Sequence, residues 1–258
     1  MLDAVTAMEW RPEGAIEVLT DDYRLVRYPD WALDPTFPAA QVTRSRAGTR
    51  PAAEVIDEVA ARVRRWRLHG VAWWVSSATL PPDTEATLCA RGGKQIDAVQ
   101  ILARELAGGL PDLDVPGDVT VELVTDERTF RAASMTAVRG WRRKEPTGAA
   151  LARELADTLR DVAAWSSFRV VAMIGQQPVS CGGCTLRAEV AQLWGAVTVR
   201  EYRRRGAYRA VLAERLRLAR EHGAALALVK GRVETSGPIL ARAGFAVYDE
   251  ERCYWLSI

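Results

Sequence analysis

The stretch "AVTVREYRRRGAYRAVLAERLRLA", residues 196–219, joins an apolar strand to an amphipathic helix through a basic turn. Three consecutive arginines, Arg203–Arg205, run into Gly206 directly before the helix. Apolar residues then recur at intervals of three and four, which predicts a helix with one buried face. A basic run beside a helix is usually a solvated surface, so the preceding strand and the glycine need an explanation.

Elementary chemistry suggests an anion site at this turn. The first turn of a helix has unpaired N–H groups and lies at the positive end of the helix dipole. Gly206 has no side chain, which would let a ligand approach this backbone closely. Arginines pair well with phosphate oxygens. A strand, a basic glycine turn and a helix in this order therefore predict a cradle for a pyrophosphate group.

Composition limits what the rest of the chain can be. The 258 residues are 48% hydrophobic and 26% charged, as in ordinary soluble globular proteins. Lys and Arg number 35 against 33 Asp and Glu, which argues against a dedicated nucleic-acid-binding module, so the anion site is expected to be local. Residues 1–19 lack the pattern of a signal peptide, and the apolar runs are too short to span a bilayer. We therefore expect a cytoplasmic protein that does not bind a membrane.

Two of the four cysteines form the sequence "CGGC", Cys181 to Cys184. A zinc or redox site would need further ligands at suitable spacing. The remaining cysteines and histidines are isolated in the chain: Cys89, Cys253, His69 and His222. We therefore expect no metal and interpret these four residues as a hairpin of small residues.

The Gly-, Pro- and Asp-rich residues 108–118 form the candidate linker between two domains, 1–116 and 117–258. Each half contains a helix, a β-prone run, a proline turn and a short helix in that order. In the second half, Asp126 or Thr125 is expected to cap a helix through about Ala137, and another helix starts near Pro146. Strands are expected over 168–174, 178–187 and 190–199, whereas 94–106 is ambiguous. The chain is expected to be α/β, with mixed sheets.

Residues Arg203 to Gly206 resemble the acetyl-CoA-binding segment of the GNAT superfamily of N-acetyltransferases, Arg/Gln-x-x-Gly-x-Gly/Ala at the start of a helix. Tyr208 departs from the last position of this signature. The stretch "VETSGPILARAGFAVYD", residues 233–249, is similar to the next GNAT segment, a short helix that ends in Gly-Phe. The resemblance extends over about residues 119–258.

The resemblance implies two GNAT-like mixed-sheet domains in tandem, of which the second has a splayed-strand acetyl-CoA site. The edge of the strand before the turn would bind the pantetheine amide, and the N–H groups of the turn would bind the pyrophosphate. Hydroxyls and apolar side chains of the later segment would lie beside the CoA arm. The implied cofactor-binding residues are Val197, Thr198, Val199, Arg204, Arg205, Gly206, Ala207, Tyr208, Arg209, Thr235, Ser236, Pro238 and Ile239.

The first half is similar to the degenerate amino-terminal repeat of tandem acetyltransferases. Residues 70–93, "GVAWWVSSATLPPDTEATLCARGG", resemble the later strand and short helix of such a repeat. No Arg-x-x-Gly-x-Gly counterpart occurs there. This half is therefore expected to pack against the second and to wall the acceptor site without binding acetyl-CoA.

Catalytic and acceptor residues are less clearly marked. Residues 190–199 lack the carboxylate that GNAT enzymes often place there, and Leu240 stands in the usual tyrosine position. Glu189 and Tyr254 are the candidate catalytic groups, as base and acid. The candidate acceptor-binding residues are Trp141, Gln192 and Trp194.

The resemblance implies an acetyl-CoA-dependent N-acetyltransferase that acts on a primary amine of a small polar molecule. An amino sugar or aminoglycoside-type antibiotic fits this description, with a role in antibiotic resistance. The alternative is a non-catalytic acyl-CoA sensor or interaction protein that has kept the cradle and lost the chemistry. The protein is expected to be a monomer or a homodimer.

Overall fold

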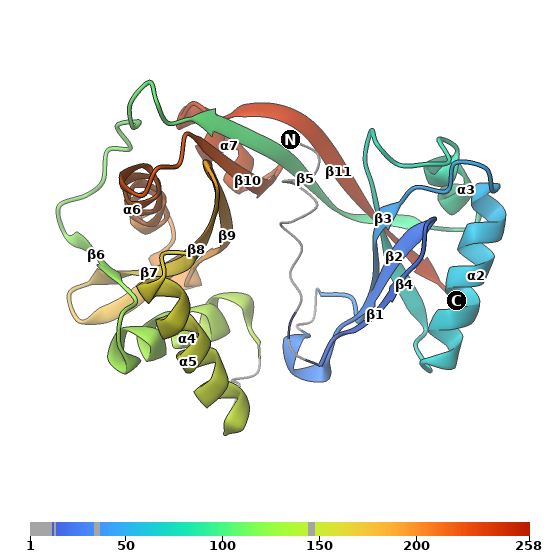
Figure 1. Cartoon of the computed structure of the whole chain (residues 1–258), viewed down its shortest axis with the longest axis horizontal. Coiled ribbons are helices and arrows are strands. Elements are labelled where there is room, and N and C mark those ends of the chain that lie inside the picture. Colours follow the sequence, from blue (N-terminus) through green and yellow to red (C-terminus); the bar gives the residue numbers. More distant parts are fainter. Residues whose placement is uncertain (1–11, 13, 34–36, 144–147) are drawn as a thin grey trace. The chain divides into compact units, whose positions relative to one another are not determined.

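The computed structural model describes residues 12, 14–33, 37–143 and 148–258 (Figure 1). Contacts divide the chain into two compact units, each assembled from separated segments. Unit 1 contains Leu102–Lys230 and Ile239–Ala246, together with Met1–Met8, which lie outside the described residues. Unit 2 contains the segments Glu9–Ile101, Gly231–Pro238 and Val247–Ile258.

The last strand of the sequence belongs to the unit built mainly from the first half. Strand β11 (Ala246–Ser257) pairs antiparallel with β4 (Gly70–Val75), with Arg252 opposite Val75 and Ser257 opposite Gly70. Conversely, the end of β5 (Lys94–Glu105) contributes Leu102 to the core of unit 1. The compact units therefore do not coincide with the predicted domains 1–116 and 117–258. That division stays a prediction about two similar halves of the sequence.

Unit 2 is a mixed sheet with two α-helices among its described residues. Its strands follow the order β1 (Ile16–Leu19), β2 (Tyr23–Arg27), β3 (Ala40–Ser45), β4, β11 and β5. The short 3-10 helix η1 (Asp30–Ala32) follows β2, while α2 (Ala52–Arg65) and α3 (Thr84–Ala90) flank β4 in sequence.

Glu58 of α2 accepts hydrogen bonds from Tyr23, Arg50 and Arg62. These donors lower the pKa of Glu58 to about 2, so its carboxylate stays ionised.

Unit 1 carries the predicted cradle. Its sheet has the order β10 (Leu226–Arg232), β9 (Val190–Thr198), β8 (Gln177–Arg187), β7 (Ser167–Ile174) and β6 (Val119–Leu123). Helix α6 (Ala207–Glu221) covers one face, while α4 (Glu127–Trp141) and α5 (Ala149–Ala163) lie on the other (Figure 1). A short helix, α7 (Ser236–Arg242), leads into β11. The expected α/β architecture with mixed sheets is confirmed, and the ambiguous segment 94–106 is a strand.

Local sequence explains where helix α4 begins and how closely it packs. Asp126 is its N-cap, and the Asp126 carboxylate accepts from the Thr129 N–H at 2.7 Å in a capping box. The helix runs to Trp141, four residues beyond the expected end at Ala137. A Cβ at Gly140 would overlap the side chain of Val197, so this glycine lets the helix approach β9. Helix α5 begins at Ala149, and Pro146 lies outside the described residues.

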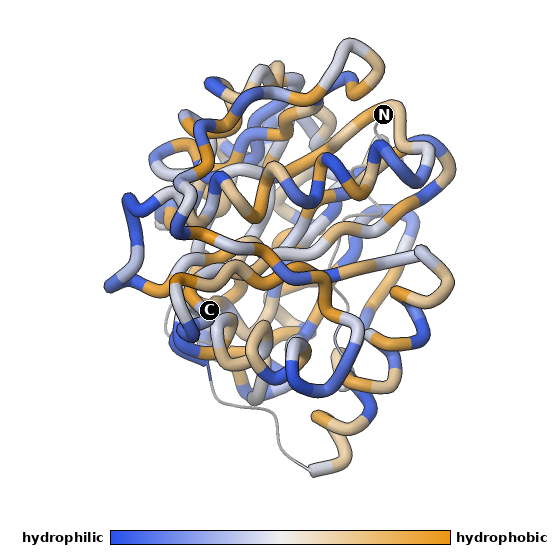
Figure 2. The backbone as a smooth tube through the Cα atoms, turned by 90° about the vertical axis from the view of Figure 1, so that its left-hand side faces the viewer, coloured by the Kyte–Doolittle hydropathy of each residue, from blue (hydrophilic) through white to orange (hydrophobic). Residues whose placement is uncertain are grey.

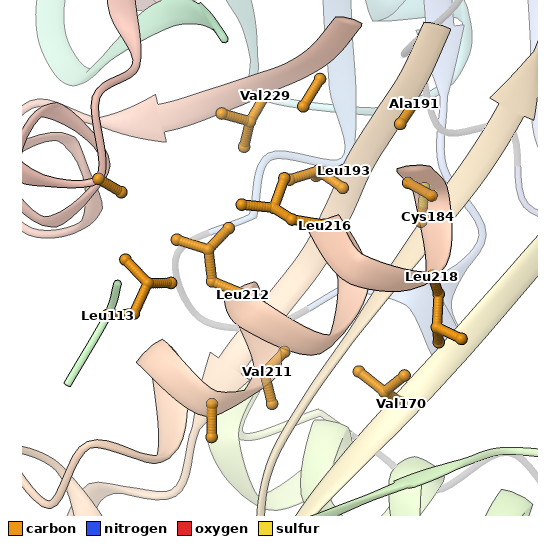
Figure 3. Packing of buried hydrophobic residues seen from close by; sticks show 14 of the residues in the cluster. Leu113, Val170, Cys184, Ala191, Leu193, Val211, Leu212, Leu216, Leu218 and Val229 are labelled. Carbon is orange, nitrogen blue, oxygen red and sulfur yellow. The ribbon is translucent and has the colours of Figure 1, made fainter. Parts of the chain in front are cut away.

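The buried face of α6 fills the core of unit 1. Figure 3 shows Leu212 and Leu216 of this helix beside Leu193 of β9, with Val170 of β7 nearby. Each of these four side chains is almost completely buried. Apolar and polar residues alternate every few positions along the helices and strands in Figure 2, as one-sided burial requires. Burying such side chains stabilises the fold by about 1.5–3 kcal/mol each, so this contact fixes α6 on the sheet.

The "CGGC" sequence lies inside strand β8, so the expected hairpin at these residues is wrong. A Cβ at Gly182 would stand 3.1 Å from Cζ of Arg215, and a Cβ at Gly183 would overlap the ring of Trp194. The two glycines therefore leave space on opposite faces of the strand for two large side chains. Packing accounts for the small residues without a metal or a redox role.

The chemistry of the cysteines agrees with this structural role. Burial raises the pKa of Cys181 and of Cys184 to about 12, so both thiols stay protonated at neutral pH. Within the part of the chain that the structure describes, no group of three or more His, Cys, Asp or Glu residues could hold a metal ion. Over the same residues, no helix combines the length and apolar character that a membrane crossing needs.

The expected linker 108–118 is part of unit 1 rather than a free connection. Leu113 is buried in the core beside α6, and Pro116 fills the space next to Gly206. A Gly- and Pro-rich composition therefore marks an irregular segment here, but not an independent one.

Substituting Gly183 with alanine should destabilise unit 1, because the new methyl group would occupy the position of the Trp194 ring. Overpacking of this kind costs about 1–3 kcal/mol in the free energy of unfolding, measured by chemical denaturation. Gly108→Ala is the matched control, since a Cβ there would meet no atom within 4 Å. Equal stability of the two variants would show that Gly183 is not needed for packing.

The native protein should show a single reactive thiol at pH 8. Cys89 is exposed, whereas Cys181, Cys184 and Cys253 are buried with raised pKa values. Titration with a chromogenic disulfide should therefore give one thiol in the native state and four after denaturation. Rapid reaction at the "CGGC" residues in the native state would contradict the packing role.

Candidate functional site: a splayed strand pair and a helix cradle

Strands β9 and β10 run side by side and then part. Their parallel pairing begins with Val190 opposite Leu226 and ends with Leu193 opposite Val229. Strand β9 nevertheless continues to Thr198. The last part of β9 therefore presents one backbone edge that β10 does not cover. This is the splayed pair that the sequence resemblance implied.

A β-bulge lies where the two strands separate. Cys181 of β8 faces Val197, whereas Gly183 faces Trp194, so β9 has one more residue than β8 across this interval. Gly195 occupies the bulge with a φ of 61°, a conformation that favours glycine. The bulge redirects β9 immediately before the cradle. This bulge is not among the sequence-based predictions, although a single glycine inside a strand pattern is a known signal for one.

Backbone pairing shows which groups on β9 remain for a ligand. The carbonyl of Val197 accepts from the Ser180 hydroxyl at 2.9 Å, and the N–H of Val199 donates to the Val179 carbonyl at 2.9 Å. Both residues therefore use the edge toward β8. Because backbone groups of successive strand residues point to opposite edges, those of Thr198 point toward the open side, where its carbonyl accepts from the Arg203 side chain at 3.4 Å.

The turn after β9 ends in an uncapped helix start. A 3-10 turn, η2 (Arg200–Tyr202), leads to Arg204 with a φ of 65° and Gly206 with a φ of 77°. Gly206 is the N-cap of α6, and no described side chain caps the helix. The N–H groups of the first turn thus remain directed at the space before the helix. Their dipoles and the adjacent arginines favour an anion there.

The space beside Gly206 is occupied by protein. The sequence-based expectation that this glycine leaves room for a ligand is therefore not met. A Cβ at this position would overlap the ring of Pro116, and its φ already lies in the left-handed region. Gly206 is therefore required by the backbone turn and by Pro116. The anion would meet the N–H groups of the turn rather than the α-carbon of Gly206.

A buried arginine connects the cradle helix to the bulge. Arg215 of α6 is 1% exposed, and its guanidinium donates to the carbonyls of Gly183 at 3.2 Å and Trp194 at 3.5 Å. Its Nη2 atom is buried with no hydrogen-bond partner among the described residues. Burial lowers the pKa of Arg215, and the Tyr208 hydroxyl opposes this shift.

Tyr208 thus has a structural explanation in a position where GNAT sequences usually have glycine or alanine. Its side chain packs against the core of unit 1, and burial raises its pKa while Arg215 lowers it. Tyr208 in the first turn of α6 therefore interacts with Arg215, which lies two turns further along the same side of the helix. We interpret Tyr208 as a support of the cradle.

The remaining implied cofactor residues are divided between the units. Thr235, Ser236 and Pro238 belong to unit 2, whereas Ile239 belongs to unit 1. The Ser236 hydroxyl accepts from the Arg232 N–H at 2.9 Å, which holds the start of α7. Their position beside a CoA arm stays a prediction.

The two candidate catalytic residues belong to different units. Glu189 is exposed in the turn between β8 and β9, at the opposite end of β9 from the cradle. Tyr254 belongs to the core of unit 2, where its hydroxyl donates to Glu85. Burial is the largest cause that raises the pKa of Tyr254 to about 12, followed by Glu85. Their catalytic roles stay predictions.

The candidate acceptor residues gather on the α4 side of the sheet. Trp194 extends over Gly183, and its indole N–H donates to Thr185 at 2.9 Å. The guanidinium carbon of Arg169 lies 5.3 Å from the centroid of the Trp194 ring. Arg169 pairs with Glu154 of α5 at 2.8 Å. No sequence pattern marks Arg169, Thr185 or Glu154, because only the register of the strands and the packing of α5 on β7 bring them together.

Of the other two candidates, Trp141 and Gln192 occupy different surroundings. Trp141 ends α4, is partly buried in the core on that side, and stacks with Arg143 at 5.6 Å. Gln192 is only 2% exposed and lies two residues before Trp194 on the same face of β9.

Comparisons with known proteins agree with this geometry. Residues 135–245 match the family model described as "Acetyltransferase (GNAT) family". No curated protein matches the chain significantly by sequence.

Solved structures with the same fold cover nearly the whole chain. A GCN5-related N-acetyltransferase from Kribbella flavida aligns over 93% of this chain and 89% of its own, with a TM-score of 0.64 and 17% identity. A tandem GNAT protein from the clavulanic acid biosynthesis pathway aligns over 99% and 87%, with a TM-score of 0.62 and 17% identity.

A third structure is part of a longer fungal protein, described as a GCN5-related glucosamine N-acetyltransferase region of a multi-domain GH3 beta-N-acetylglucosaminidase. It aligns over 93% of this chain and 31% of its own, with a TM-score of 0.61 and 11% identity. At these identities the likeness establishes the fold. Residues 135–245 thus match the GNAT acetyltransferase family model, and the chain shares the fold of GCN5-related N-acetyltransferases.

Proposed function

We propose that the chain transfers the acetyl group of acetyl-CoA to a primary amine of a small polar molecule. One observation carries this proposal: β9 parts from β10 after Leu193 and leads directly into an uncapped, arginine-flanked helix start. A CoA molecule has a pantetheine chain that can bond to a strand edge and a pyrophosphate that suits a helix N-terminus. Unit 1 offers both features along one continuous segment.

The cofactor would lie along residues that the geometry leaves available. The N–H of Thr198 would bond to a pantetheine carbonyl, since β8 uses the backbone of Val197 and Val199 and the Thr198 carbonyl accepts from Arg203 at 3.4 Å. The N–H groups of Arg205–Arg209 would bind the pyrophosphate. Arg205 and Arg209 are partly exposed, at 47% and 37% of their side chains, and would add charge-assisted bonds.

The acceptor would approach from the face that carries Trp194. On the opposite face, Leu193 and Val229 are buried, at 1% and 6% exposure, under the side chains of α6. Trp194 remains partly exposed on the side of α4 and α5. A rigid aromatic surface beside Arg169 and Glu154 is suited to a polar ring with hydroxyl and amino groups.

The reaction itself requires a neutral amine. The amine nitrogen forms a bond to the thioester carbon, the carbon–sulfur bond breaks, and the thiolate leaves as CoA. The amine loses a proton and the thiolate gains one, directly or through water. Glu189 and Tyr254 are the candidates for these transfers from the sequence, and a water molecule could serve in place of either.

Small amino sugars and aminocyclitols are the first acceptors to test. They combine a primary amine with a polar ring, and one structure of similar fold is described as a glucosamine N-acetyltransferase region. An aminoglycoside-type antibiotic has the same chemistry. Acetyl-CoA would be the donor in each case.

Arg205→Gln and Arg209→Gln should each weaken CoA binding about three- to tenfold, because each removes a charged hydrogen-bond donor at the cradle. Calorimetry with CoA measures the effect directly. Arg220→Gln changes the same charge at the other, exposed end of α6 and is the matched control. Substitution of Gly206 is less informative, since it would also disturb Pro116. Equal affinities for all four proteins would place the cofactor elsewhere.

A thiol-release assay with acetyl-CoA and a panel of amines should show turnover for at least one amino sugar or aminocyclitol. The matching compound with a hydroxyl in place of the amine should be inactive, because it lacks the attacking nitrogen. Mass spectrometry of the product identifies the acetylated position. Tight CoA binding without turnover on any amine would reject the enzyme and favour the acyl-CoA sensor.

A further inference from the structure

An acidic segment of unit 1, Asp112–Asp118, lies across the start of helix α6. Its composition, "DLDVPGD", suggested a linker, but its residues make specific contacts with the cradle. We call it the acidic segment. Its position matters because it brings negative charge to the place proposed for the phosphates of CoA.

Apolar contacts and a turn hold the acidic segment in place. Leu113 is 8% exposed and points toward Leu212 of α6 (Figure 3). Pro116 occupies the space in which a Cβ of Gly206 would lie, and its carbonyl accepts from the Val119 N–H at 3.1 Å. The backbone that carries Asp112, Asp114 and Asp118 is therefore held near the cradle.

Two of the three carboxylates pair with arginines of the cradle. Asp118 accepts from Arg205 at 3.0 Å, and Asp114 accepts from Arg209 at 3.2 Å. The third carboxylate, that of Asp112, instead accepts from the N–H of Asp114 at 2.9 Å. A carboxylate and a phosphate oxygen occupy the same donor positions of a guanidinium, so one arginine face cannot serve both fully.

We propose that Asp114 and Asp118 compete with the phosphates of CoA for Arg209 and Arg205, and so set the affinity of the cofactor site. This inference rests on the proposed function, because it takes the cradle as the CoA site. All four side chains of the two pairs are at least 37% exposed, so the pairs can open without unfolding the segment. The acidic segment thereby weakens CoA binding and favours its release.

Whether CoA affinity rises or falls when a carboxylate is removed shows whether that carboxylate competes with CoA or helps to bind it. If a carboxylate only oriented its arginine, removing the carboxylate would weaken CoA binding. If it competes, removing it strengthens CoA binding. Exposed ion pairs have small energies, so each substitution is expected to change the affinity about two- to fivefold.

The experiment measures CoA affinity by calorimetry for the full chain and for Asp114→Asn, Asp118→Asn and the double variant. Each single variant should bind CoA about two- to fivefold more tightly, and the double variant about tenfold, since the pairs involve different arginines. Asp112→Asn is the matched control. It removes the same charge in the same segment and can keep the bond to the Asp114 N–H, so its affinity should stay within about twofold.

A double-mutant cycle identifies the mechanism. In an Arg205→Gln background, Asp118→Asn should lose most of its effect, because the arginine for which the anions compete is absent. An equal gain in both backgrounds would point to general repulsion and overturn the pairwise exchange. Equal or weaker CoA binding by the single variants would also overturn it. Failure of the wild-type protein to bind CoA at all would instead reject the proposed function, and this inference with it.

Discussion

Helix α6 packs closely against strands β8 and β9 because Gly182 of β8 has no side chain on the face that the helix covers. The guanidinium of Arg215 occupies the vacant space and donates to carbonyls of both strands. A buried charge is costly unless it is hydrogen-bonded, so Arg215 ties the helix and the two strands into one arrangement. The position of the cradle depends on this contact, since the cradle is the turn that joins β9 to α6.

The features proposed for cofactor binding follow from that arrangement. Arg215 holds the carbonyl of Trp194 directly before the bulge at Gly195, and it supports Tyr208 in the first turn of α6. The bulge and the helix start are therefore positioned relative to each other within unit 1. Trp194 covers Gly183 on the opposite face, so the same pair of glycines also shapes the proposed acceptor side.

Local patterns predicted the parts that depend on local physics. The strand, turn and helix of residues 196–219, the cap at Asp126 and the strand over 178–187 follow from periodicity, capping and turn chemistry, and the structure contains them. The pairing of β11 with β4 could not be predicted, because an exchanged strand keeps its own hydrophobic pattern. The acidic segment and the cluster of Arg169 with Glu154 were missed for a similar reason, since residues distant in sequence make their contacts. The catalytic groups stayed unassigned because residues 190–199 contain no carboxylate and Leu240 stands in the usual tyrosine position.

The central claim is that unit 1 binds one CoA along β9 and the start of α6. The most direct measurement is a crystal structure of the full chain with CoA. We expect pantetheine beside Thr198, phosphate oxygens bonded to the N–H groups of Arg205–Arg209, and Asp118 separated from Arg205. A CoA molecule bound away from this segment, or a second one in unit 2, would contradict it.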